Sequence, residues 1–235
     1  MKERKTRRGD AVLWDRLALE VHQMRVVTLV GAGGKTTLLY ALAREAAALG
    51  KTVCITTTTH MFPHPDLPSG NVVQEGQLLP DGKLTLGPSI EKCRSQYDLV
   101  LVEGDGAHGR PLKVPGVGEP VIPAESDVVI CVAGMSALGG RIVGVCHRPE
   151  LVCALLKKPG DGIIAAADYV TILSSQEGGR KGLPAGVAYR CVLNQAEGAA
   201  REQAAAEIIE TLKGQNIWAV QTAFEEKERG GQCLF

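Results

Sequence analysis

The glycine-rich segment Gly31–Thr37 (GAGGKTT) is the feature that most constrains how this chain folds. The β-branched, apolar run 26–30 precedes it and predicts a buried strand. The run 35–49 follows it, is rich in Ala and Leu, and predicts a helix that ends at Gly50. Residues 52–57 predict the next strand. Because a strand, a tight loop, a helix and a strand in this order form a βαβ unit, we expect a parallel sheet.

The apolar runs farther along the chain extend this pattern into one layered domain. They alternate between strand-like and helix-like periods, without an internal repeat or a long linker. We therefore expect a single doubly wound α/β domain with a mostly parallel sheet over residues 11–235, preceded by a basic tail over residues 1–10. Residues 71–87 predict a small hairpin insertion with its turn at residues 80–83. The other expected strands are 98–103, 127–132, 188–193 and 217–220, the expected helices are 16–24, 89–96, 149–158 and 197–213, and 163–173 fits either type.

Composition and charge exclude several classes of protein. Hydrophobic residues make up 45% of the 235 residues, which is too many for an intrinsically disordered chain. The 26 Lys and Arg residues balance the 26 Asp and Glu residues, so we expect no nucleic acid and no membrane as a partner. No apolar run of roughly 18 residues could span a bilayer, and no apolar signal core follows the basic tail. We therefore expect a cytoplasmic protein with reduced thiols.

The glycine-rich segment also predicts a phosphate-binding loop. Glycines let backbone N–H groups approach phosphate oxygens, and the start of the following helix carries a partial positive charge. The Lys35 ammonium can reach the β- and γ-phosphates, and the Thr36 hydroxyl can bind Mg²⁺. We therefore expect Mg²⁺ with ATP or GTP at this loop. The residues expected to contact this complex are Gly31, Ala32, Gly33, Gly34, Lys35, Thr36 and Thr37.

The spacing of this loop departs from the commonest phosphate-binding pattern. That pattern places a glycine five residues before the glycine of the Gly-Lys pair, where this chain has Leu29. The shortened loop resembles the Gly-x-x-Gly-Lys-Thr loop of the Mur ligases, which implies ATP binding. An ordinary glycine-rich turn with an exposed lysine is the alternative.

The segment Glu103-Gly104-Asp105-Gly106 supplies candidate acidic residues at the end of a strongly apolar strand. In a doubly wound sheet the carboxyl ends of the strands face the ligand crevice. Glu103 and Asp105 are therefore candidate catalytic residues that hold Mg²⁺ or orient an attacking water, and Glu103 is the first choice for the metal. A carboxylate that only caps a turn or helix is the alternative. Arg110 and Lys113 follow on a long loop and can bind an anionic substrate or stabilise developing phosphate charge.

Three other segments supply candidates for binding a second substrate or a base. Thr58 and His60 follow the second strand and are expected at the same edge of the sheet. Asn194 follows a later strand in the position of a base-reading loop, and its amide can bind a nucleobase edge. Gln195 stands where the base-reading loops of GTP-binding proteins have Lys, so ATP and GTP both stay open. His147 is a further second-substrate candidate.

Taken in order, six segments of the chain resemble the YqeC family. They are 31–37 (GAGGKTT), 56–61 (TTTTHM), 103–113 (EGDGAHGRPLK), 119–123 (EPVIP), 147–150 (HRPE) and 193–195 (LNQ). The resemblance implies a fold like that of P-loop nucleoside triphosphate hydrolases. It also implies a bacterial or archaeal cytoplasmic accessory protein for selenium-dependent molybdenum hydroxylases. By matching positions, Lys35 and Thr36 would take the phosphate and Mg²⁺ roles, and Glu103 and Asp105 would form the acidic site.

These observations lead us to predict an NTPase that assists the maturation of a molybdenum hydroxylase or acts on its cofactor machinery. One alternative is a small-molecule kinase or ligase with a Mur-like loop. The other is a selenium carrier that binds nucleotide without hydrolysis and uses Cys146, His147 and Cys153. Phosphate release without an acceptor would distinguish the NTPase. The predicted catalytic residues are Lys35, Glu103, Asp105 and Arg110, and the predicted second-substrate residues are Thr58, His60, Lys113 and His147.

Overall fold

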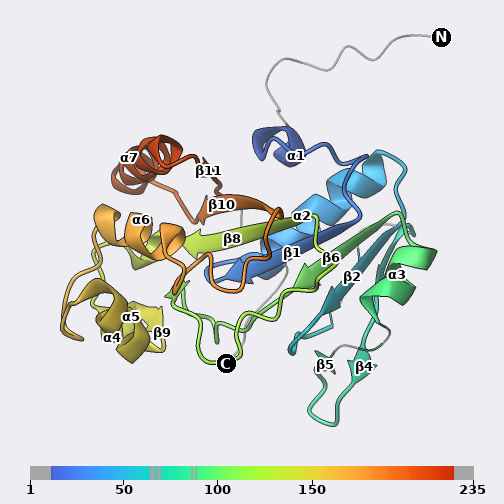
Figure 1. The fold of residues 1–235 in the computed structure, drawn as a ribbon, viewed down its shortest axis with the longest axis horizontal. Coiled ribbons are helices and arrows are strands. Elements are labelled where there is room, and N and C mark those ends of the chain that lie inside the picture. The colour runs from blue at the N-terminus through green and yellow to red at the C-terminus, as the bar shows by residue number, and fades with distance from the viewer. Residues whose placement is uncertain (1–11, 64–66, 68–69, 86, 88, 225–235) are drawn as a thin grey trace.

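A computed structural model describes residues 12–63, 67, 70–85, 87 and 89–224 of this chain. The expected basic tail 1–10 lies outside the described residues, as do residues 11 and 225–235 of the expected domain. The described residues build on one seven-stranded sheet in which every pair of neighbouring strands is parallel (Figure 1). The strand order is β11-β10-β8-β1-β6-β2-β3. The strands are β1 (Val26–Gly31), β2 (Val53–Thr57), β3 (Val72–Gln74), β6 (Leu99–Glu103), β8 (Val128–Gly134), β10 (Ala188–Asn194) and β11 (Trp218–Gln221).

Helices cover both faces of this sheet, which confirms the predicted doubly wound α/β fold. The two faces of β1 show why its sequence is mostly apolar. Val27 and Leu29 pack with α1 and α2 on one face, while Val30 packs with α6 and α7 on the other. On that second face α3 covers β2 and β6. The helices named here are α1 (Leu13–Arg16), α2 (Lys35–Ala48), α3 (Ile90–Gln96), α6 (Ala166–Ser174) and α7 (Ala199–Gly214).

The strand order reverses at β1. The chain first builds β2, β3 and β6 on one side of β1, and then builds β8, β10 and β11 on the other. Ligands of doubly wound sheets bind in the crevice outside the carboxyl ends of the strands at such a switch point. Residues 104–126 run along this edge of the sheet (Figure 1). The topology therefore places the loop after β1 at the position where a ligand is expected.

A small unit lies beyond the carboxyl ends of β8 and β10. Its two short strands pair in parallel, with Leu112 opposite Cys146 and Lys113 opposite His147. Sequence patterns did not predict these strands, because each has two residues and its partner is far away in the chain. The elements of this unit are β7 (Leu112–Lys113), α4 (Ile142–Val145), β9 (Cys146–His147) and α5 (Pro149–Leu156), and the turn η1 (Met135–Ala137) leads to it from β8.

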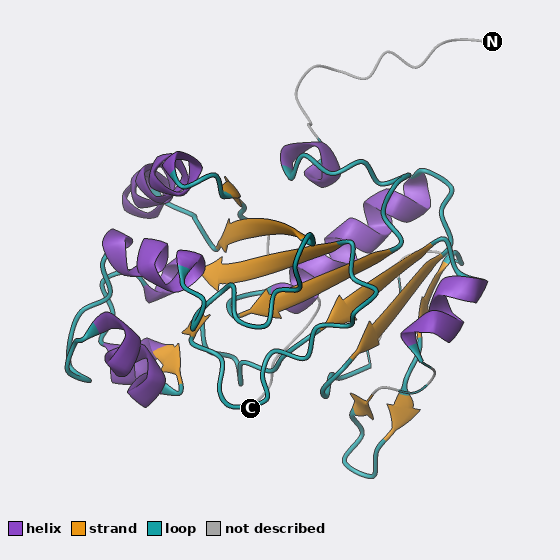
Figure 2. Cartoon of the chain, viewed as in Figure 1, coloured by secondary structure: helices purple, strands orange, loops and turns teal. Residues whose placement is uncertain are grey.

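Two expectations about local structure need correction. The predicted hairpin exists as β4 (Gln77–Leu78) and β5 (Leu84–Thr85) and stands beside the sheet (Figure 2). However, β3, which was expected in the same hairpin, joins the main sheet parallel to β2. The predicted helix 16–24 is wrong, because the helix is α1, which ends at Arg16, and residues 17–24 are turns and irregular chain. Among the described residues, no helix combines the length and apolar character needed to cross a membrane.

Candidate functional site

The loop between β1 and α2, residues 31–34, requires glycine for reasons of close packing. We call it the glycine loop. Gly31, Gly33 and Gly34 have φ angles of 93°, 84° and 111°. A Cβ on Gly31 would lie 2.2 Å from the carbonyl oxygen of Val132, and a Cβ on Gly33 would lie 2.4 Å from the backbone of Gly134. The loop is therefore pressed against the end of β8, where side chains do not fit.

The backbone amides of the glycine loop and those of the first turn of α2 have different partners. The N–H of Ala32 donates to the carbonyl oxygen of Val132 at 2.8 Å, and the N–H of Gly31 donates to Oδ2 of Asp105 at 3.1 Å. These two amides, which were expected to contact phosphate, are thus used inside the protein. The first-turn amides of α2, from Lys35 onward, have no partner within the helix. The opening turn of α2, directly after the loop, is therefore the part of this segment suited to bind an anion.

Lys35 lies in a buried cluster with both predicted acidic residues. Its Nζ is 3.6 Å from Oε1 of Glu103 and 3.4 Å from Oδ1 of Asp105, and it donates to the carbonyl oxygen of Gly31 at 2.7 Å. Burial opposes the charge on Lys35, but the two carboxylates outweigh it and raise the pKa of the ammonium. Lys35 is therefore a charged, buried lysine at the start of α2, paired with two carboxylates.

Glu103 connects the start of α2 to the segment that follows β2. Its Oε2 accepts a hydrogen bond from the Thr36 hydroxyl at 3.3 Å. Its carbonyl oxygen accepts the backbone N–H of Thr58 at 3.1 Å. Burial raises the pKa of Glu103, and Asp105 adds to that effect while Lys35 opposes it. The structure thus brings the predicted metal residues Thr36 and Glu103 together, with Thr58 directly behind them.

Lys113 does not face the crevice, although it was predicted to contact a second substrate. Its Nζ is fully buried, 2.9 Å from Oδ2 of Asp105 and 3.0 Å from Oε2 of Glu119. Glu119 is in turn held by both terminal guanidinium nitrogens of Arg148. Burial favours the neutral form of Glu119, but hydrogen bonds from Arg148 and Lys113 lower its pKa to about 2. Lys113 is therefore an internal counter-ion.

The remaining second-substrate candidates, and the predicted catalytic residue Arg110, lie at different places. His147 is half-buried and stacks on exposed His108, with ring centroids 5.0 Å apart. Burial and the nearby charges of Lys113 and Arg148 lower the pKa of His147. Arg110 is exposed, and its guanidinium donates to the carbonyl oxygen of Gly144. His60 is exposed, and its neighbour Met61 pairs with Leu84 of β5, so His60 lies next to the hairpin.

Asn194 supports the glycine loop rather than presenting a free amide. Its Nδ2 donates to the carbonyl oxygen of Gly33 at 2.8 Å, and its Oδ1 accepts the Thr222 hydroxyl at 2.9 Å. A Cβ on Gly34 would lie 2.1 Å from this Nδ2. Because Asn194 is buried and both polar atoms are used, it is not placed to read a base in this structure.

The cysteine-histidine segment does not form a metal centre. Among the described residues, no group of three or more His, Cys, Asp or Glu side chains could hold a metal ion. Cys146 is buried, and burial raises the pKa of its thiol to about 12. Cys153 is only partly buried. The hypothesis of a soft-metal or selenium site at these residues therefore gains no support from their geometry.

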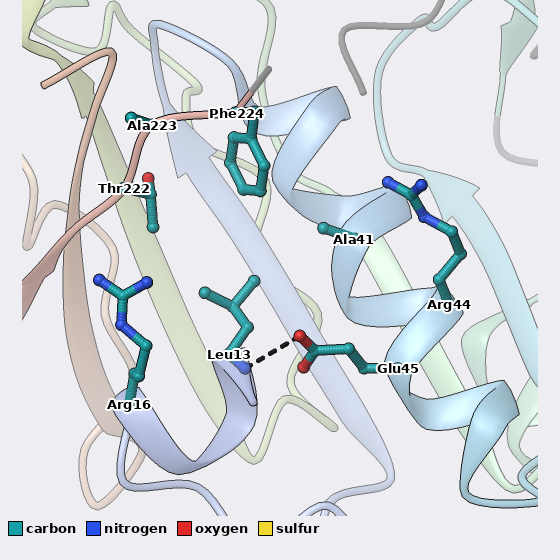
Figure 3. Close-up of a pocket in the computed structure, with 8 residues that line it drawn as sticks. All are labelled: Leu13, Arg16, Ala41, Arg44, Glu45, Thr222, Ala223 and Phe224. Carbon is teal, nitrogen blue, oxygen red and sulfur yellow. Dashed lines mark hydrogen bonds between the residues drawn. The ribbon is translucent and has the colours of Figure 1, made fainter. Parts of the chain in front are cut away.

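A surface hollow of about 380 Å³ lies between α1, α2 and residues 222–224 (Figure 3). Thr222, on its rim, links it to the loop through Asn194. Glu45 of α2 accepts the backbone N–H of Leu13 at 3.0 Å and so fixes α1 against α2 (Figure 3). The lining residues are Leu13, Arg16, Ala41, Arg44, Glu45, Thr222, Ala223 and Phe224.

Sequence reasoning did not single out three residues that complete the site. Glu119 and Arg148 pair with each other, and Glu119 also pairs with Lys113. Both lie in segments that carried the resemblance, 119–123 and 147–150, and this was the available signal. Thr222 lies just after β11 and carried no signal, because its role depends on Asn194 of the neighbouring strand.

Comparisons with known proteins agree with the resemblance. The family model described as "YqeC protein" matches residues 27–150. This range includes the glycine loop, the acidic residues and the start of α5. A protein of Escherichia coli (strain K12) described as "Uncharacterized protein YqeC" is 30% identical over 224 residues, which cover 83% of this chain and 85% of that protein.

Proposed function

The chain belongs to the YqeC family, and we propose that it is a magnesium-dependent nucleoside triphosphatase that uses ATP or GTP. We further propose that this activity assists, in the cytoplasm, the maturation of a selenium-dependent molybdenum hydroxylase or its cofactor. The geometry of the site supports the nucleotide part of this proposal. The resemblance found in the sequence supports the part about the hydroxylase.

The observation that carries the nucleotide proposal is the position of Lys35. It combines a lysine at the first turn of α2, a tight glycine loop before it, and two carboxylates within 3.6 Å of its ammonium. A lysine with only a structural role would not require a helix N-terminus at the switch point of the sheet. A triphosphate requires this arrangement, because backbone amides, a lysine and a metal held by carboxylates bind it.

The residues present fit Mg²⁺. The Thr36 hydroxyl and Oε2 of Glu103 are hard oxygen donors 3.3 Å apart. Adjacent ligands of an octahedral Mg²⁺, each at about 2.1 Å, lie about 3 Å apart. Oδ1 of Asp105 is buried and faces the Lys35 ammonium at 3.4 Å, so it becomes available to a cation or its water when Lys35 moves to the phosphates. When bound, Mg²⁺ would neutralise charge on the phosphate oxygens.

Each part of the proposed reaction is assigned to particular residues. The opening amides of α2 and the Lys35 ammonium would bind the phosphates, and Glu103 and Thr36 would hold the metal. A water oxygen would attack the γ-phosphorus while the bond to the β–γ bridging oxygen breaks, giving the diphosphate and phosphate. Asp105 would keep the loop in shape through its contact with the Gly31 amide. Arg110 is exposed and would bind a second substrate by leaving the carbonyl oxygen of Gly144.

Phosphoryl transfer to a small molecule is the second candidate, and one observation favours it. His108 and His147 stack at the edge of the 104–126 segment, and Pro111 of that segment accepts the backbone N–H of Gly134 beside the glycine loop. Burial and the charges of Lys113 and Arg148 lower the pKa of His147 and so favour its neutral form, which a base that accepts a proton from an acceptor hydroxyl needs. Phosphate release that strictly depends on an added acceptor would favour this candidate.

The test compares nucleotide binding and phosphate release in the wild type and Lys35→Ala. We expect the wild type to bind ATP or GTP with Mg²⁺ and to release phosphate, and Lys35→Ala to lose both. Lys51→Ala, which removes a lysine just after α2, is the matched control and should keep both. Circular dichroism would show that each variant is folded. Unchanged nucleotide affinity in folded Lys35→Ala would contradict the proposal.

A further inference from the structure

Ion pairs link six charged side chains of alternating sign, from Glu103 at the end of β6 to Arg148 just before α5. We call this set the chain of charges. Lys35 lies between the two acidic residues at the end of β6. Lys113 lies between Asp105 and Glu119, and Arg148 closes the chain at Glu119. In order, the members are Glu103, Lys35, Asp105, Lys113, Glu119 and Arg148.

Lys35 and Lys113 share one carboxylate, that of Asp105. Lys113 Nζ lies 2.9 Å from Oδ2, and Lys35 Nζ lies 3.4 Å from Oδ1. The side chains of Lys113 and Asp105 are 0% exposed, so water screens their interaction poorly. The strength with which Asp105 holds Lys35 therefore depends on how fully Lys113 neutralises it.

Lys35 must move before it can bind a triphosphate. In this structure its ammonium donates to the carbonyl oxygen of Gly31 and faces two carboxylates. Withdrawing it would leave Asp105 buried, and a buried carboxylate without a cation is costly. Lys113 remains within 2.9 Å of Asp105 in that event. It is the ammonium that can keep this carboxylate paired.

We propose that Lys113 is a positioning residue for nucleotide binding, because its neutralisation of Asp105 releases Lys35 to the phosphates. This inference rests on the proposed function. Lys113 itself does not contact the nucleotide. Glu119 competes with Asp105 for Lys113, and Arg148 weakens this competition by pairing with Glu119. Residues remote from the phosphates therefore also influence nucleotide affinity.

The alternation of charge predicts alternating effects of substitution. Glu119→Gln removes the competitor for Lys113, so Asp105 is better neutralised and nucleotide binds more tightly. Arg148→Leu leaves Glu119 to attract Lys113 more strongly, so Asp105 retains Lys35 and nucleotide binds more weakly. Loss of a purely structural contact would weaken binding or stability in both variants. The opposite signs therefore separate positioning from support of the fold.

The experiment measures the Kd of Mg-ATP and Mg-GTP by titration calorimetry with the full chain. We expect Lys113→Met to raise Kd about tenfold or more, Arg148→Leu to raise it about threefold, and Glu119→Gln to lower it about threefold. Lys113→Arg, which keeps the charge, should restore most of the affinity. Arg141→Leu is the matched control, because Arg141 is exposed at the start of α4 and lies outside the chain of charges. Its Kd should equal that of the wild type.

Two variants that keep Lys113 cover the case in which Lys113→Met does not fold. Glu119→Gln and Arg148→Leu leave both Lys113 and Asp105 in place, so their opposite effects on Kd test the inference independently. Equal signs for Glu119→Gln and Arg148→Leu, or an Arg141→Leu effect as large as that of Arg148→Leu, would overturn the inference while the wild type still binds nucleotide. A wild type that binds neither nucleotide would overturn the proposed function, and the inference with it.

Discussion

At the scale of single residues, one side-chain amide ties the glycine loop to the outer strands of the sheet. Asn194 bridges the carbonyl oxygen of Gly33 and the hydroxyl of Thr222. Asn194→Ala removes both hydrogen bonds and leaves the part-buried Gly33 carbonyl and the buried Thr222 hydroxyl without this partner. We expect the free energy of unfolding to fall by about 1–3 kcal/mol and nucleotide affinity to fall as the loop loosens.

Urea unfolding and nucleotide titration would measure these effects. Thr222→Val is the matched control, since it removes only the hydroxyl and leaves the bond from Asn194 to Gly33. Its loss of stability should be smaller, and its nucleotide affinity should stay near that of the wild type. Equal stability of Asn194→Ala and the wild type would show that this bridge does not support the loop.

Glu119 makes the stability of the protein depend on pH. Its pKa is lowered from 4.5 to about 2 in the folded state, against the effect of burial, by hydrogen bonds from Arg148 and Lys113. A lowered folded-state pKa contributes stability above the unfolded value, and this contribution is lost as pH falls. We therefore expect the stability difference between wild type and Glu119→Gln to be full above pH 4.5 and to shrink toward pH 2. Urea unfolding at several pH values would measure it, and a difference that grows on acidification would contradict this assignment.

At the scale of elements, the junction of β1 and α2 depends on contact with β8. A Cβ on Gly33 would lie 2.4 Å from the backbone of Gly134 and 2.7 Å from the carbonyl oxygen of Pro111. We expect Gly33→Ala to destabilise the protein strongly and to abolish nucleotide binding. Gly50→Ala is the matched control, because Gly50 also has a positive φ, 85°, but no atom lies within 4 Å of its added Cβ.

The two substitutions separate backbone strain from steric overlap. Gly50→Ala should cost about 1–2 kcal/mol, the cost of a left-handed conformation for a residue with a Cβ. Gly33→Ala should exceed that value in urea unfolding, since the backbone atoms it meets cannot move aside like a flexible side chain. Similar costs for the two variants would mean that packing against β8 does not determine the glycine loop.

The same elements show what the sequence could predict. The run 26–31, the glycines and the helix after them follow local rules of period and backbone conformation, so this unit was predicted correctly. The pairing of Leu112 with Cys146 and the two-residue strands around it depend on contacts far apart in the chain. The internal partners of Lys113 and Asn194 could not be predicted for the same reason. Their residue types suit a ligand, but other parts of the fold already supply their partners.

At the scale of the whole molecule, the topology gathers the site from both halves of the sheet. Glu103 comes from the side of β6, Asn194 comes from the side of β10, and the glycine loop lies between them at the end of β1. The chain of charges then extends from this point to α5. A ligand that binds at the glycine loop therefore contacts a structure to which both halves contribute, so its binding should stabilise the fold as a whole.

This expectation can be measured as a thermal shift. A ligand at about 100 times its Kd stabilises the state that binds it by about 2.7 kcal/mol. For a chain of this size, each kcal/mol raises Tm by about 2–4 °C, so saturating Mg-ATP or Mg-GTP should raise Tm by about 5–10 °C. The shift should shrink when Mg²⁺ is removed by a chelator, because Thr36 and Glu103 would then hold no metal. Lys35→Ala should show almost no shift, whereas Lys51→Ala should shift as the wild type does. A full shift in Lys35→Ala would place the nucleotide elsewhere on the molecule.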